Sequence, residues 1–60
     1  MSRRAAEAVF TGQFLLCDIR GLLRDSAPHH RLSEQQKEEA ARALGRLEKQ
    51  VAILKEELLR

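Results

Sequence analysis

The sequence predicts an all-α protein, an antiparallel two-helix hairpin whose fold is completed by oligomerisation or by a partner helix. Two long segments carry apolar residues at helical spacing, and a single cluster of helix-breaking residues separates them. The chain has 60 residues and one cysteine, so it can bury only a small core and cannot form an internal disulfide. We therefore expect one domain over residues 1–60, stabilised in part by another chain.

The first helix is predicted over about residues 3–25, with Ser2 as its N-cap. Gly12 and Gly21 lie inside this segment, and each weakens a helix by up to about 1 kcal/mol relative to alanine. Neither glycine has a proline beside it, so we expect the helix to continue through both positions.

A loop over about residues 26–33 and a second helix over about 34–60 follow. Pro28 has no backbone N–H and disfavours helical geometry at Ala27. Ser33 and Gln36 then have the spacing of a capping box, in which each side chain bonds the other residue's backbone N–H. This pair predicts the start of the second helix.

The predicted hairpin core follows a heptad pattern in both helices. Apolar residues alternate at spacings of three and four, as they do in a coiled-coil seam. The residues assigned to this core are Val9, Leu16, Ile19, Leu23, Leu44, Leu47, Val51, Leu54 and Leu58.

A second apolar stripe lies almost opposite the first stripe of the N-terminal helix. It consists of Phe10, Phe14, Cys17 and Gly21. A helix that is apolar on two faces is buried on both, and one partner helix inside a hairpin covers only one of them. We therefore predict that this stripe is the interface with another protein or with a second copy of the chain.

The residue pattern does not favour an enzyme. Zinc needs three or four ligands at local spacing, which His29, His30 and Cys17 do not provide. Two helices enclose no pocket in which Cys17 would find a catalytic base, and the three glycines are isolated rather than grouped in a phosphate-binding loop. We predict no catalytic residue, no metal, no cofactor and no small-molecule substrate.

Charge and hydropathy argue against nucleic acid and membranes as binding partners. The net charge of +2 comes from residues 1–32, which hold five basic and three acidic groups, whereas residues 33–60 are balanced. This excess is too small to indicate a phosphate-binding surface, so nucleic acid is disfavoured as a partner. The longest apolar run has four residues, against about 20 for a membrane span. One thiol and no apparent secretion signal predict a cytoplasmic protein without a membrane role.

Ser33-Glu34-Gln35 opens a predicted helix that later contains Leu47-Glu48 and Ile53-Leu54. With these residues, the size and the hairpin layout resemble those of the small co-chaperones of type III secretion needle subunits. The loop around Pro28 is longer than expected for that family. The resemblance implies a cytoplasmic hairpin in a heteromeric complex, which keeps a needle protein from polymerising early.

Two other interpretations remain open. The size and architecture are also similar to those of ROP, a dimeric four-helix bundle, and that resemblance implies RNA binding through a helix face. Arg3, Arg20 and Arg24 would have to supply such a surface here. Alternatively, the second helix forms a homo-oligomeric structural coiled coil with its own copy, which Val51 and the leucines permit.

Overall fold

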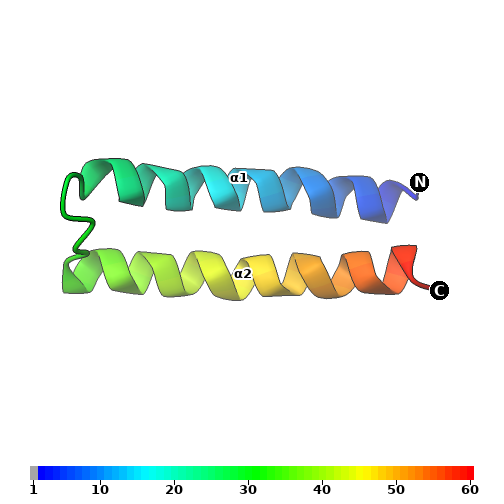
Figure 1. Ribbon diagram of the computed structural model, residues 1–60. Helices are drawn as coiled ribbons and strands as arrows, with labels where there is room; N and C mark the ends of the chain where they lie inside the picture. Colours follow the sequence, from blue (N-terminus) through cyan, green and yellow to red (C-terminus); the bar gives the residue numbers. More distant parts are fainter. Residues whose placement is uncertain (1) are drawn as a thin grey trace.

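The computed structural model describes residues 2–60 and contains two antiparallel helices that lie side by side (Figure 1). Helix α1 spans Arg3–Asp25 and helix α2 spans Glu34–Leu58. The hairpin measures 41 × 15 × 14 Å, and both ends of the described chain lie at the end opposite the loop. The prediction of an all-α helical hairpin is confirmed. Helix α2 ends two residues before the predicted position 60.

Both helices begin at the predicted serine caps. The Ser2 hydroxyl accepts the N–H of Ala5 at 3.0 Å. At α2, the Gln36 N–H donates to Ser33 Oγ at 3.1 Å, and the Ser33 N–H donates to Gln36 Oε1 at 2.8 Å. These bonds satisfy backbone donors that have no partner within the helix, and they complete the predicted capping box.

The loop folds back onto the last turn of α1. The Ser26 N–H donates to the Leu22 carbonyl at 3.1 Å, and the His30 N–H donates to the Ser26 carbonyl at 2.8 Å. His30 has a φ of 56° and places its Nδ1 3.0 Å from the Leu23 carbonyl. Because a carbonyl oxygen only accepts, Nδ1 must carry the hydrogen in this contact. His30 thus anchors the loop to α1.

The contact between the helices is made mainly by small residues. The buried residues on α1 are Ala5, Ala8, Gly12 and Leu15, and α2 contributes Ala43. A Cβ atom placed on Gly12 would lie 3.6 Å from Leu47 Cδ1. Leu15 is 2% exposed and is the one large side chain in this group. Small side chains allow two helix backbones to approach closely, so this seam is narrow.

The position of the seam corrects the predicted core. Four of the nine assigned residues are half-buried between the helices, namely Val9, Ile19, Leu47 and Leu54. The other five are exposed, with fractions of 53% for Leu16, 48% for Leu23, 47% for Leu44, 43% for Val51 and 57% for Leu58. The assignment of these five to the hairpin core is wrong. The apolar arc of α1 is wider than one partner helix can cover, and the alanine and glycine side of that arc gives the closer approach.

Polar contacts around Glu57 join the two helices at the end opposite the loop. Glu57 accepts from Ser2 Oγ at 2.6 Å, from Arg4 at 3.1 Å and from Arg60 at 3.0 Å. Its carboxyl pKa is lowered from the ordinary value of 4.5, chiefly by the Ser2 hydrogen bond and then by Arg4 and Arg60. Partial removal from water opposes this shift but is outweighed. Glu56 adds a 2.9 Å contact with Arg4.

Replacing Gly12 by alanine should raise the free energy of unfolding by about 0.5–1 kcal/mol, because alanine has the higher helix propensity. The new methyl group would meet Leu47 at an ordinary van der Waals distance. Gly45→Ala, with no neighbour within 4 Å, serves as the propensity control. Gly12→Leu should instead destabilise the hairpin by about 1–3 kcal/mol, because it overfills the seam. Urea unfolding followed by circular dichroism at one chain concentration would test this, and equal stability of the two Gly12 variants would contradict it.

Glu57→Gln should remove a pH-dependent part of the stability. Because the folded-state pKa of Glu57 lies below 4.5, its contribution is complete above that value and is lost as the pH falls through the lowered pKa. The stability difference between the wild-type chain and Glu57→Gln should therefore shrink as the pH decreases below about 4.5. Thermal melts between neutral and acidic pH would measure it, with exposed Glu38→Gln as the control for losing one carboxylate. A difference that stays constant with pH would contradict the assignment.

Candidate functional site

Side chains that could bind a metal ion are dispersed in the described part of the chain. Residues 2–60 contain no cluster of three or more His, Cys, Asp or Glu that could hold a metal ion. In the same range, no buried side-chain nitrogen or oxygen lacks a hydrogen-bond partner. Cys17 is exposed, and His29 and His30 lie on the exposed loop. The candidate sites described below are surfaces on the outside of the hairpin.

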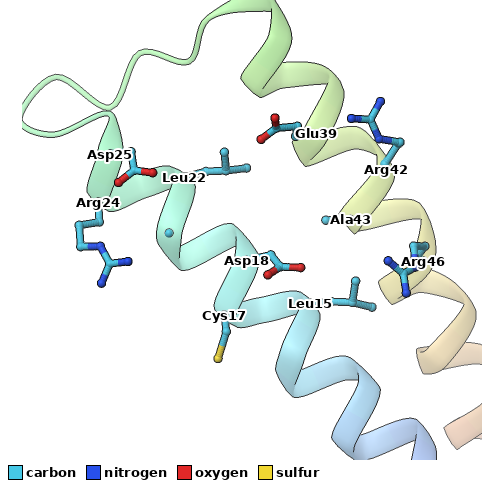
Figure 2. Close-up of a pocket in the computed structure, with 11 residues that line it drawn as sticks. Leu15, Cys17, Asp18, Leu22, Arg24, Asp25, Glu39, Arg42, Ala43 and Arg46 are labelled. Carbon is cyan, nitrogen blue, oxygen red and sulfur yellow. The ribbon is translucent and has the colours of Figure 1, made fainter.

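The first surface is the outer face of α1. Phe10 and Phe14 are 63% and 73% exposed, which is unusual for phenyl rings. Cys17 is also exposed, and a Cβ atom added to Gly21 would meet nothing within 4 Å. Figure 2 shows Cys17 pointing away from α2. We call the stripe of Phe10, Phe14, Cys17 and Gly21 the Phe face. It coincides with the predicted interface, whose use by a partner stays a prediction.

The second surface spans both helices on one side of the seam. We call it the leucine face, and it consists of Val9, Leu16 and Leu23 from α1 together with Leu44, Val51 and Leu58 from α2. Within each helix these residues are seven positions apart, so they project from the same side. A groove between the helices on this side is lined in part by Val9, Leu16, Leu47, Val51 and Leu54. The heptad pattern placed these residues inside the hairpin, so this surface was not predicted from the sequence.

The third surface is a groove on the opposite side of the seam, close to the loop (Figure 2). Leu15 and Leu22 point from α1 toward α2 at the level of Ala43. Asp18 and Glu39 point into the space between the helices. The charged residues that line the groove are Asp18, Asp25, Glu39, Arg24, Arg42 and Arg46. Equal numbers of acids and bases produce no strong field of one sign that would select a charged ligand.

The arginines considered for RNA binding are dispersed. Arg3 bonds Glu7 at 3.1 Å, so its charge is already paired on the surface. Arg20 and Arg24 are exposed and lie one turn apart on α1. Arg24 also lines the groove that holds Asp25 and Glu39. Two neighbouring cations beside several acids form a short ridge rather than a basic stripe along a helix.

No protein-family model, curated protein or solved structure matches the chain. Neither helix within residues 2–60 is long and apolar enough to cross a membrane. The functional interpretation rests on the exposure of the two apolar faces.

Proposed function

We propose that this protein is a non-enzymatic protein–protein interaction module, a small adaptor or co-chaperone that binds a helix of another protein through the Phe face. The observation that carries the proposal is the exposure of Phe10 and Phe14 on α1, on the side away from the buried residues of that helix. Exposed aromatic side chains that follow one helix face are typical of helix-to-helix recognition.

The composition of the Phe face suits a helical partner. Its members are spaced four, three and four residues apart, so they form one continuous stripe along α1. The two phenyl rings supply apolar area at one end of the stripe. Cys17 and Gly21 at the other end are small, which permits a partner backbone to approach closely. Burial of each phenyl ring would contribute about 1.5–3 kcal/mol before the entropy of association is subtracted.

The hairpin also prepares α1 for binding. Ser2 caps the helix. The helix packs against α2 through its buried residues, Ala5, Ala8, Gly12 and Leu15. The recognition helix is therefore formed before a partner arrives, and less conformational entropy is lost on binding. The free thiol of Cys17 on this face is suited to a reducing compartment such as the cytoplasm.

The resemblance to type III secretion needle co-chaperones suggests a particular form of this role. In that form, the partner helix belongs to a subunit that polymerises, and the Phe face covers an apolar stripe that the subunit would otherwise use for assembly. Helix covering helix needs no catalytic group, because the hairpin acts by occupying the surface.

Phe14→Glu should weaken the complex with the partner at least tenfold, since it removes one ring and places a charge in an apolar interface. The measurement starts with a photo-crosslinking amino acid at position 10 of the protein in the cells that make it. A discrete heteromeric adduct is expected, and Phe14→Glu should abolish it. The matched control is Leu59→Glu, which introduces the same charge at an exposed leucine beyond the end of α2 and should leave the adduct intact.

Two results would contradict the proposal. One is an adduct at position 10 that contains only a second copy of the chain, which would assign the Phe face to self-association. The other is a heteromeric adduct of equal yield in the wild type and in Phe14→Glu, which would show that the phenyl rings do not carry the binding.

A further inference from the structure

We infer that the leucine face is a homodimer interface, on which a second copy of the hairpin packs to form a four-helix bundle. This interface is separate from the Phe face, and the inference does not rest on the proposed function. Five of its six side chains are about half exposed in the single hairpin, and four of these are leucines.

The register of the hairpin arranges these side chains in layers. Ser2 contacts Glu57, Arg4 contacts Glu56, and Gly12 lies against Leu47, so facing positions have numbers that add up to about 60. Val9 therefore lies level with Val51 on the leucine face. Leu16 lies level with Leu44 in the next layer, one heptad away along both helices. Leu58 and Leu23 extend the face toward the open end and the loop end, respectively.

This layering is self-complementary. A two-fold axis in the plane of the face can run along the helices or across them. Along the helices, each layer meets the same layer of the second copy. Across the helices, the valine layer of one copy meets the leucine layer of the other. In both cases apolar side chains meet apolar side chains across two helices, as an isologous interface requires. The second hairpin has the same length and the same two stripes, and so it reaches Leu23 and Leu58 at opposite ends of the face.

The size of the face agrees with a dimer. A hairpin of 41 × 15 × 14 Å presents a flat side of about 600 Å² in projection, and the accessible area of such a corrugated side is larger. Stable interfaces bury about 800 Å² per partner, so one whole side of the hairpin supplies the required area. Among the described residues, Leu15 is the one large side chain that the single hairpin buries. A second copy would supply the missing core.

The geometry leaves the Phe face free in this dimer. At 100° per residue, the mean direction of Phe10 and Phe14 lies about 140° around α1 from the mean direction of Val9, Leu16 and Leu23. Cys17 points away from α2 on that same outer side (Figure 2). The only cysteine of the chain thus reports which face is covered.

The first experiment measures the mass of the purified chain by light scattering from about 1 to 100 μM, a range that includes the weakest affinities typical of interfaces of this size. We expect a helical dimer with twice the chain mass of 6.9 kDa. Attaching a bulky maleimide to Cys17 should leave that mass unchanged. A helical monomer at the highest concentration would overturn the inference, as would a dimer that dissociates when Cys17 is modified.

Substitutions provide a second, independent test. Leu16→Glu combined with Leu44→Glu should raise the dimer dissociation constant on the order of 100-fold, because both charges fall in the central leucine layer. Leu59→Glu, outside the face, is the matched control and should have no effect. If the double variant unfolds, Leu16→Ala replaces it, because alanine weakens the same layer without adding a charge. Any helicity that Leu16→Ala loses should be recovered at higher chain concentration. A double variant that stays helical and dimeric would overturn the inference.

Discussion

The close contact between α1 and α2 through small side chains is the constraint on which the rest of the molecule depends. The helix backbones are brought together by four small residues, Ala5, Ala8, Gly12 and Ala43. Leu15 fills the space beside them. A seam of this kind buries little apolar area, so it determines the geometry of the hairpin more than its stability. Apart from Leu59, the exposed larger apolar side chains are displaced to one flank of the seam or to the outer side of α1.

The displaced side chains fall on two separate surfaces with different chemistry. The leucine face is aliphatic, spans both helices and follows strict heptads, which is the pattern of a bundle core. The Phe face is confined to α1 and combines two aromatic rings with small residues. Its rings lie on the outer side of α1, and Cys17 and Gly21 also line the groove close to the loop. This difference supports our two proposals, that the first completes the fold with a second copy and that the second recognises a different protein.

The sequence was sufficient to predict the two helices and the loop, but not which face of each helix packs against the other. Pro28, Ser2 and the Ser33–Gln36 pair act locally, so the start of both helices and the position of the loop could be predicted. The choice of seam depends on a tertiary contact. In α1, the stripe through Ala5, Ala8, Gly12 and Leu15 has the same three-and-four spacing as the stripe through Val9 and Leu16. Periodicity does not distinguish two adjacent stripes; the run of small residues was the available signal that the closest approach lies there.

The angular separation of the two faces has a consequence for avidity. A dimer formed through the leucine face would present two copies of the Phe face on its outside, held at a fixed distance by packed helices. After one copy had bound, the other would search only the volume around the first, so a partner with repeated helices would be held far more tightly than a partner with one. Such a bivalent clamp would discriminate between an isolated helix and an assembled array of helices without any additional contact to either.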